Sequence, residues 1–391
     1  MVKPLAARVA RVRASETVRI ASLVAEKRRA GVDVVSFSVG EPDFDTPEHV
    51  RAAAKQALDD GHTHYTPAAG IHDLRAAIAA KHRDENAMVD VRPEDVVVTP
   101  TKQAIAQAIL AVVDHGDEVL LPDPAWVSYE PLIQLAGGRP VPVPVDAEHG
   151  FRLTADRLAE HVTSKTKLII TNSPSNPTGG TDTEADVRGH ADLAKDHDLY
   201  LLSDEIYEHI RYEGRHVSPA SLDGMAERTM TVNGLSKSFA MTGWRLGWVV
   251  APPPLLKEIL KIQSHTITHV TSFAQYGGIA ALTGPQEPVR EMVRTFARRR
   301  EIVLEALAAM PGVTCANPTG AFYVFPRIDA AAGDDVRFTE RLLEEADVAV
   351  TPGSAFGAGG AGHVRISYAT SEERLRTGLD RLGRFLAAQR A

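Results

Sequence analysis

A lysine in the loop between two apolar stretches could supply an amine for chemistry. Lys237 follows the apolar run at residues 230–232, and Arg245 stands eight residues later, directly before the run at residues 246–250. Strand interiors exclude unpaired ammonium groups, so such a lysine either turns outward or is held for a reaction that needs an amine nucleophile, such as Schiff base formation. Taken alone, the residue favours the outward orientation.

Polar residues near the ends of other apolar runs favour the chemical alternative. Asp204 ends the run at residues 199–203 and precedes Tyr207, whereas Asn176 follows the run at residues 167–170. Open parallel sheets bind ligands where strands give way to loops. Together with the lysine and the arginine, these groups suit pyridoxal phosphate. That cofactor needs an amine for its aldehyde, a carboxylate for its pyridine nitrogen, donors for its phenolic oxygen and a cation for its phosphate.

Four motifs stand in a fixed order along the chain. They are SPSNPTG at 173–179, SDEIYE at 203–208, NGLSKSFAMTGWRLGW at 233–248 and HVRISYA at 363–369. The set resembles the class I aminotransferases of fold type I, in particular their bacterial and archaeal aspartate aminotransferase branch. The resemblance runs from about residue 36 to residue 369, and it depends on several motifs that agree in order and spacing.

The resemblance implies a role for each polar residue of these motifs. Lys237 would hold the aldehyde of the cofactor and then carry the proton at the substrate Cα, and Asp204 would pair with the pyridine nitrogen. Tyr207 and Asn176 would hold the phenolic oxygen. Trp126 would stack on the pyridine ring, and its alternative is an ordinary core tryptophan. Asn176 and Trp126 are also expected to face the substrate.

The phosphate of the cofactor is expected at the junction between a strand and a helix. Free N–H groups and the positive end of a helix dipole suit a phosphate there, although an ordinary threonine cap is the alternative. The family commonly has glycines where this chain has Pro100 and Thr101. Because proline has no N–H, the Thr101 hydroxyl or later amides, including that of Lys102, must contribute. Arg245 would bind two phosphate oxygens with its guanidinium, and Ser236 is expected beside it.

The remaining implied contacts are with the substrate and with a second subunit. Arg365 would bind the substrate α-carboxylate, and its alternative is an outward-facing strand residue. Gly40 resembles the glycine whose backbone closes over that carboxylate, unless it is a simple turn glycine. Lys102 would pair with the distal carboxylate of acidic substrates, or else face solvent or the cofactor phosphate. Tyr65 resembles the tyrosine that reaches the phosphate in the neighbouring subunit, which implies a homodimer with shared sites.

Apolar runs alternate with helix-like segments along most of the chain. Runs that predict strands of a large unit lie at residues 96–99, 118–121, 139–145, 167–170, 199–203, 230–232 and 246–250. This alternation predicts an α/β fold whose large domain has a mostly parallel sheet covered by helices. After the prolines at 252–254 the pattern is helical to about residue 310.

The C-terminal part of the sequence predicts a smaller unit. Its expected strands lie at residues 323–325, 348–350 and 364–367. The resemblance implies a smaller α+β domain built from both termini. The expected division is an N-terminal segment at 1–44, a large cofactor-binding domain at 45–284 and a small domain at 285–391.

Length and charge bound the kinds of protein this chain can be. With 391 residues it exceeds what one hydrophobic core usually serves, so two domains are expected. A net charge of −8 with interspersed signs predicts no nucleic-acid partner and no membrane-binding patch. The basic runs at residues 27–29 and 298–300 lie in polar helical patterns and are predicted to be solvated.

The numbers and positions of cysteines and histidines indicate which cellular compartment and which metal sites can be expected. The single cysteine, Cys315, cannot form an internal disulfide, is expected to be a small buried hydrophobe, and fits a reducing, cytoplasmic setting. The N-terminal stretch has no apolar segment long enough for a signal peptide or a membrane span. There are fifteen histidines, but only His62 and His64 are near neighbours, so no metal site is predicted.

The sequence therefore predicts a cytoplasmic, homodimeric, pyridoxal-phosphate-dependent aminotransferase. Its substrates are expected to be aspartate or glutamate and a 2-oxo acid such as 2-oxoglutarate. The alternatives on the same scaffold are an aromatic or broad-range aminotransferase and a β-lyase. A transcription regulator would need a basic DNA-binding domain, for which the residues before Gly40 are too few. A nicotinamide-binding protein would need a GxGxxG turn near the N-terminus, and none is found there.

Overall fold

A seven-stranded sheet forms the centre of the computed structural model, which describes residues 5–10, 12 and 15–389. Its strands are β2 (Val96–Thr99), β3 (Glu118–Asp123), β4 (Arg139–Pro144), β5 (Thr166–Asn172), β6 (Tyr200–Asp204), β7 (Thr229–Gly234) and β8 (Gly247–Val250). They stand in the order β2-β8-β7-β6-β5-β3-β4, and β8 runs antiparallel to both of its neighbours whereas the other pairs are parallel. The prediction of a mostly parallel sheet is therefore confirmed.

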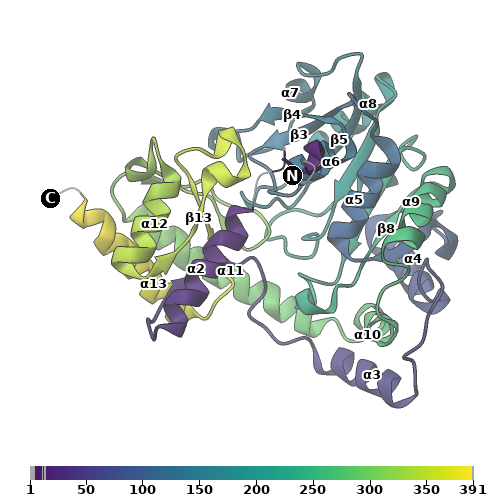
Figure 1. The fold of residues 1–391 in the computed structure, drawn as a ribbon, viewed down its shortest axis with the longest axis horizontal. Coiled ribbons are helices and arrows are strands. Elements are labelled where there is room, and N and C mark those ends of the chain that lie inside the picture. The colour runs from purple at the N-terminus through teal and green to yellow at the C-terminus, as the bar shows by residue number, and fades with distance from the viewer. Residues whose placement is uncertain (1–4, 11, 13–14, 390–391) are drawn as a thin grey trace.

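Helices cover both faces of this sheet (Figure 1). Val119 and Leu121 of β3 pack in one apolar cluster with α5 (Thr101–Val112), whereas Leu120 between them packs in another with α8 (Glu184–Asp196). Successive side chains of a strand point to opposite faces, so a strand covered on both sides needs an unbroken apolar run. This is why the strands could be predicted from such runs.

The other helices of the larger unit are α3 (Glu48–Asp59), α4 (His72–Asn86), α6 (Tyr129–Ala136), α7 (Ala155–Ala159), α9 (Pro253–Thr266) and α10 (Ser272–Thr283). The starts of two helices differ in a way that matters for ligand binding. In α8, Thr183 Oγ1 accepts from the Asp186 N–H while the Asp186 carboxylate accepts from the Thr183 N–H, which satisfies two free donors. In α5, Pro100 occupies the cap position and its side chain caps nothing, so the first N–H groups of α5 have no side-chain cap.

The smaller unit joins both ends of the chain (Figure 1). β1 (Val35–Ser36) pairs in parallel with β12 (Val348–Ala349), and α2 (Glu16–Arg29) shares an apolar cluster with α12 (Asp335–Ala346). The remaining elements are α11 (Glu287–Ala308), β9 (Val313–Thr314), β10 (Tyr323–Val324), β11 (Arg327–Ile328), β13 (Thr351–Pro352), β14 (Val364–Ser367) and α13 (Glu372–Ala388). The predicted α+β unit built from both termini is thus confirmed.

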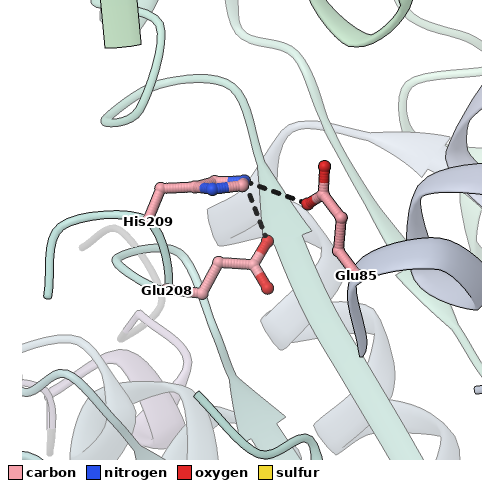
Figure 2. Close-up of side chains that lie close together, drawn as sticks. All are labelled: Glu85, Glu208 and His209. Atoms are coloured by element: carbon pink, nitrogen blue, oxygen red, sulfur yellow. Dashed lines mark ion pairs between the residues drawn. The ribbon is translucent and has the colours of Figure 1, made fainter. Parts of the chain in front are cut away.

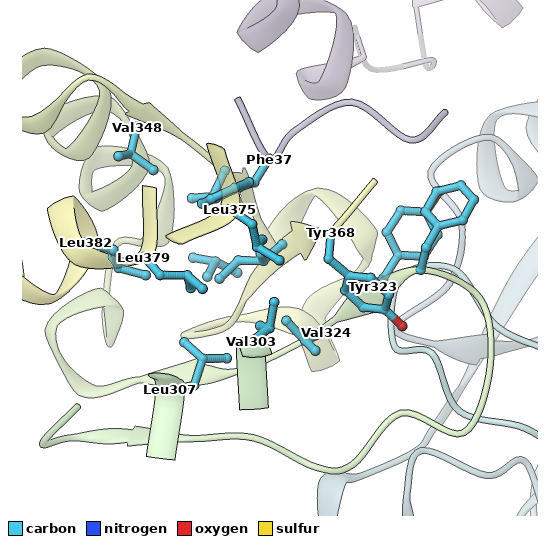
Figure 3. Packing of buried hydrophobic residues seen from close by; sticks show 14 of the residues in the cluster. Phe37, Val303, Leu307, Tyr323, Val324, Val348, Tyr368, Leu375, Leu379 and Leu382 are labelled. Carbon is cyan, nitrogen blue, oxygen red and sulfur yellow. The ribbon is translucent and has the colours of Figure 1, made fainter. Parts of the chain in front are cut away.

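The apolar core of the smaller unit holds residues that lie far apart in the sequence. Figure 3 shows Phe37 from the N-terminal segment close to Leu375 of α13, in one cluster with Val324 of β10. The short helix α1 (Ala7–Ala10) lies beside α6 of the larger unit. The exact domain boundaries, after residues 44 and 284, stay predictions.

The basic run at residues 298–300 is not fully solvated, and here the sequence prediction is wrong. Arg299 is buried, and its Nη1 and Nη2 donate to Asp43 Oδ1 at 2.6 Å and Oδ2 at 2.9 Å. It stands three residues after the buried Phe296 and four before the buried Val303, so the helical period places it on the buried stripe of α11. The ion pair ties the N-terminal segment to α11.

Two further expectations concern the chain terminus and the cysteine. Residues 1–4 of the N-terminal stretch lie outside the described residues, as do residues 11, 13 and 14. None of the helices in the described part of the chain is long and apolar enough to cross a membrane. Cys315 packs, partly buried, against the core of the smaller unit, and burial raises the pKa of its thiol to about 12.

Candidate active site

Lys237 points into the protein from the loop after β7. Its Nζ donates to the Gly40 carbonyl at 2.6 Å, which excludes the outward orientation. Burial lowers the pKa of the Lys237 ammonium to about 8, and the charge of Arg365 acts in the same direction. A larger share of neutral amine is therefore present near neutral pH than for an exposed lysine, as a nucleophile or a base requires.

Asp204 and Tyr207 lie next to this lysine. Asp204 ends β6 with 5% of its surface exposed, and its Oδ2 accepts from the Tyr129 hydroxyl at 2.7 Å. Burial raises the pKa of Asp204 to about 6, although the hydrogen bond from Tyr129 opposes the shift. The ring centroid of Tyr207 lies 6.0 Å from Lys237 Nζ, and its hydroxyl lies 2.8 Å from that of Tyr323.

Arg365 comes to the same place from β14 of the smaller unit. It is 4% exposed, so its outward-facing alternative is wrong. Its Nη1 donates to Asn176 Oδ1 at 2.9 Å and its Nη2 to the Ser38 carbonyl at 2.6 Å. Within the described residues its Nε has no partner and no carboxylate pairs with it. A buried cation without a counter-ion is costly, so this guanidinium is suited to an anionic ligand.

We name these five side chains the active-site cluster: Lys237, Asp204, Tyr207, Asn176 and Arg365. They come from four segments that the fold brings together. β5, β6 and β7 are adjacent and parallel, so their carboxyl ends lie along one edge of the sheet. The smaller unit adds the arginine across that edge.

The start of α5 offers a second place for an anion. Thr101 opens this helix, and its Oγ1 is buried without a hydrogen-bond partner in the part of the chain that the structure describes. The predicted alternative of a threonine cap is wrong because Pro100 holds the cap position. A Cβ at Gly234 would lie 2.5 Å from Thr101 Oγ1, and one at Gly247 would also collide with it. Both glycines therefore keep the space around this hydroxyl open.

Two further cations lie near this helix start. Arg245 precedes β8, and because β8 is antiparallel its beginning falls at the same sheet edge as the ends of the parallel strands. Lys102 Nζ lies 4.9 Å from the ring centroid of Trp126. Burial lowers the pKa of Lys102, and the nearby charge of Arg245 lowers it further. Among the described residues neither cation is paired with a carboxylate, which suits a phosphate.

The remaining predicted site residues have clear positions. Ser236 is buried next to Lys237, and its carbonyl accepts from the Met241 N–H at 3.2 Å. A Cβ at Gly40 would lie 2.6 Å from the Tyr323 hydroxyl, so this position needs glycine for space. Tyr65 is 89% exposed, and its ring lies edge-on to that of His269 with the ring centroids 5.4 Å apart.

Three contributors to the site were not predicted from the sequence. Tyr129 bonds to Asp204, Tyr323 bonds to Tyr207, and the Ser38 carbonyl accepts from Arg365. Tyr129 could have been suspected because it follows Trp126 by three residues, where the loop ends and α6 begins. Tyr323 lies in the apolar run of a predicted strand and gave no signal, and a carbonyl acceptor has no side-chain signature.

A second charged group includes the residues that directly follow Asp204 and Tyr207 in the chain, Glu205 and Glu208. We call it the buried ion cluster, and it comprises Lys81, Asn86, Glu205, Glu208 and His216. Lys81 Nζ donates to Asn86 Oδ1 at 2.6 Å and also to a carboxylate oxygen of Glu208, whose other oxygen accepts from Asn86 Nδ2 at 2.7 Å. His216 Nε2 lies 3.0 Å from Glu205 Oε2.

The edge of this cluster has ligands that a metal ion could use (Figure 2). His209 Nε2 lies 3.4 Å from Glu208 Oε1 and 3.5 Å from Glu85 Oε2. Lys81 Nζ contacts Glu208 and lies 3.6 Å from Glu85, so an ammonium already supplies the positive charge there. The histidine spacing in the sequence gave no sign of this grouping. The prediction that the chain holds no metal stays a prediction.

Comparisons with known proteins agree with the geometry. The sequence pattern of the family described as aminotransferase class I and II matches residues 32–382. The aspartate aminotransferase of Pyrococcus abyssi is 48% identical over 358 residues, which cover 90% of this chain and 92% of that protein. A probable aspartate/prephenate aminotransferase of Aquifex aeolicus is 45% identical over 394 residues, 99% of each chain. The structure of the Thermus thermophilus aspartate aminotransferase with maleate matches with a TM-score of 0.93 at 45% identity, covering 98% of this chain and 100% of that one.

Proposed function

The chain belongs to the class I and II aminotransferases, and we propose that it transfers the amino group of aspartate or glutamate to a 2-oxo acid such as 2-oxoglutarate. The family implies pyridoxal 5′-phosphate as the cofactor. The observation that carries the proposal is the convergence of Lys237, Asp204 and Arg365, three buried ionisable groups from separate segments that do not neutralise one another. The aromatic and β-lyase alternatives are not favoured by the full-length relatives.

The residues of the site fit the cofactor. Lys237 would hold its aldehyde, and the buried Asp204 carboxylate would face its pyridine nitrogen. The unpartnered Thr101 hydroxyl and the cation pair of Lys102 and Arg245 would receive its phosphate. The glycines around Thr101 leave room for that phosphate, since side chains there would fill the space. Trp126, with the ammonium of Lys102 over its ring, would line one face of the cofactor, and Ser236 would lie beside the phosphate.

The polar groups of the site then have defined tasks, and Lys237 has two. When bound, pyridoxal phosphate accepts the amino group and withdraws electrons from the substrate Cα. Lys237 Nζ would take the proton from that carbon and return it, because its lowered pKa near 8 lets it act in both directions. Arg365 would hold the α-carboxylate with Asn176 and the backbone at Gly40 beside it. Tyr207 would donate to the phenolic oxygen.

Borohydride reduction followed by peptide mapping tests the assignment of the amine. The reduction fixes the cofactor to the amine that holds it, and the label is expected on Lys237. A label on another lysine contradicts the proposal. Single half-reactions of a panel of amino donors, followed by cofactor absorbance, would then rank aspartate and glutamate against neutral donors.

The preference for acidic substrates rests on Lys102. We expect its ammonium to reach the distal carboxylate, because it stands beside Trp126 and has no carboxylate partner in the described chain. Lys102→Ala should lower kcat/KM for aspartate and glutamate by roughly ten- to a hundredfold while sparing alanine and phenylalanine. An equal loss for all donors would assign Lys102 to the cofactor phosphate alone. Prephenate, which appears in the names of several relatives, is a dicarboxylic acceptor that the same assay should include.

The proposal includes a homodimer with shared sites, supported by the high exposure of Tyr65. Tyr65 would reach the phosphate in the partner subunit. Mixing Tyr65→Phe chains with Lys237→Ala chains gives heterodimers in which one site carries both defects and the other carries neither. Activity should partly return on mixing. Mixed dimers that remain inactive would contradict the shared site. A cytoplasmic location is also proposed, and it rests on the single Cys315.

A further inference from the structure

Tyr323 contacts three parts of the candidate active site, although no role was assigned to it from the sequence. It is fully buried in β10, and its hydroxyl lies 2.8 Å from that of Tyr207. The guanidinium of Arg365 lies 4.7 Å from its ring centroid. Its hydroxyl also lies 2.6 Å from the place of a Cβ at Gly40. Figure 3 shows Tyr323 at the side of the core cluster opposite Leu382.

The hydrogen count of the two phenols makes the direction of their bond important. Each tyrosine hydroxyl carries a single hydrogen and can also accept. If Tyr207 donates to Tyr323, it has no hydrogen left for a cofactor oxygen. If Tyr323 donates, Tyr207 keeps its hydrogen for that oxygen. In the described residues the Tyr323 hydroxyl has no hydrogen-bond partner other than Tyr207, so its own hydrogen has no competing acceptor.

The charge of Arg365 favours the second direction. A cation over an aromatic ring withdraws electron density from the ring and its hydroxyl, which makes that hydroxyl a better donor. Chains of hydrogen bonds polarise one another, so a donated bond from Tyr323 also strengthens the bond that Tyr207 donates onward. The smaller unit would thereby influence the cofactor through Tyr323 and the hydrogen bond that it donates to Tyr207.

We propose that Tyr323 is a positioning residue whose hydroxyl donates to Tyr207, so that the only hydrogen of Tyr207 is directed to the phenolic oxygen of pyridoxal phosphate. This inference rests on the proposed function. It links the arginine that would bind the substrate carboxylate to the hydroxyl that would donate to the cofactor, through a residue of the smaller unit.

The pH titration of the bound cofactor's visible absorbance tests this role. A hydrogen bond donated to the phenolic oxygen favours the more negative state of the cofactor and lowers the titration midpoint. Tyr323→Phe keeps the ring and its contact with Arg365 but removes the donor. The midpoint should therefore rise by about 0.5–1 pH unit.

Tyr368→Phe is the matched control. Tyr368 is equally buried in the same core, but its hydroxyl bonds to the Tyr212 hydroxyl at 3.0 Å and to the Ala321 carbonyl at 3.2 Å. Removing this hydroxyl deletes the same chemical group without touching Tyr207, so the midpoint should stay at the wild-type value. A midpoint in Tyr323→Phe equal to that of wild type or of the control would overturn the proposal.

A double variant tests whether Tyr323 acts through Tyr207. Tyr207→Phe alone should raise the midpoint further than Tyr323→Phe, and adding Tyr323→Phe to it should change nothing more. Additive shifts would overturn the inference because they would mean independent effects. A wild-type chain that binds no pyridoxal phosphate would instead contradict the proposed function, so the two failures are distinguishable.

Discussion

The active-site cluster and the buried ion cluster each take two residues from one short segment at the end of β6, yet their charges are satisfied in different ways. Asp204 and Tyr207 belong to the first, and Glu205 and Glu208 belong to the second. The chain turns directly after β6, with the Glu208 N–H bonded to the Glu205 carbonyl. Residues three apart in such a turn share a side, so adjacent acids enter different surroundings.

The pKa shifts state the difference. In the active-site cluster burial is the leading cause, and it raises the pKa of Asp204 and lowers those of Lys237 and Arg365, so each charge is disfavoured. In the buried ion cluster burial acts in the same sense but partners outweigh it. Lys81 holds the pKa of Glu208 well below its usual value, and Glu205 raises that of His216.

The comparison shows how a ligand site can be distinguished from a structural ion cluster when both are buried and charged. A structural cluster satisfies its own charges, whereas a ligand site leaves charges whose partners have yet to arrive. The first predicted consequence is that substitutions in the two clusters should affect different measurements: activity for one, and the free energy of unfolding for the other.

The largest effect is expected for Lys237→Ala. Amino transfer should fall by several orders of magnitude, because the nucleophile and the proton carrier are lost together. The cofactor-free protein should keep or gain stability, since its buried ammonium is already disfavoured. Half-reaction absorbance and urea unfolding measure the two effects. A large loss of unfolding free energy in Lys237→Ala would contradict the proposed difference between the active-site cluster and the buried ion cluster.

The next effect is expected for Glu208→Gln in the buried ion cluster. Replacing Glu208 removes the buried carboxylate that pairs with the Lys81 ammonium and leaves only the half-exposed Glu85 at 3.6 Å, which should cost about 3–5 kcal/mol of unfolding free energy. Lys81→Met combined with Glu208→Gln is the control and should cost less than the sum of the single variants. Urea denaturation measures these free energies of unfolding. Losses that add up in the double variant would show that the two side chains are not paired.

Asp204 should give the cofactor-free protein a pH dependence opposite in sign to that of the Glu205 and Glu208 carboxylates, whose pKa values are lowered. Its folded pKa of about 6 lies above the ordinary 3.8, so the ionised form is disfavoured in the folded state. As pH rises from about 4 to 6, wild type should lose up to about 3 kcal/mol relative to Asp204→Asn, and above that window the difference should stay constant. Parallel stability curves of the two proteins across this range would contradict the assignment.

The smallest effect is expected at the exposed rim of the buried ion cluster. Glu85 contacts Lys81 and His209 at 3.6 and 3.5 Å, but nearly half of its side chain is exposed. Glu85→Gln should therefore cost less than about 1 kcal/mol, and added salt should reduce the difference further. A loss as large as that of Glu208→Gln would mean that solvent does not screen this rim.

Local patterns in the sequence predicted much of the fold and of the site. Unbroken apolar runs predicted most of the strands because these are buried on both faces, the edge strand β4 being the exception. Asn176, Asp204 and Lys237 were found because parallel strands end at one edge, which makes the place of a residue after a run informative. Arg245 lies at the same edge for another reason. It precedes β8, which runs antiparallel, so the beginning of β8 falls where the parallel strands end.

Partnership between distant residues was decided only by the tertiary structure. In the sequence, Asp204 and Glu205 are neighbouring acids, and only the fold shows that Glu205 has the partner His216 whereas Asp204 lies beside Lys237. Arg299 likewise looked solvated until Asp43 was brought to it. Neighbours along the chain determine periodicity and turns, which the sequence displays. Burial and charge pairing depend on residues that are distant in the chain and meet only in the folded protein. The sequence therefore determined which groups were available, and the tertiary structure decided which of them remained free to bind a ligand.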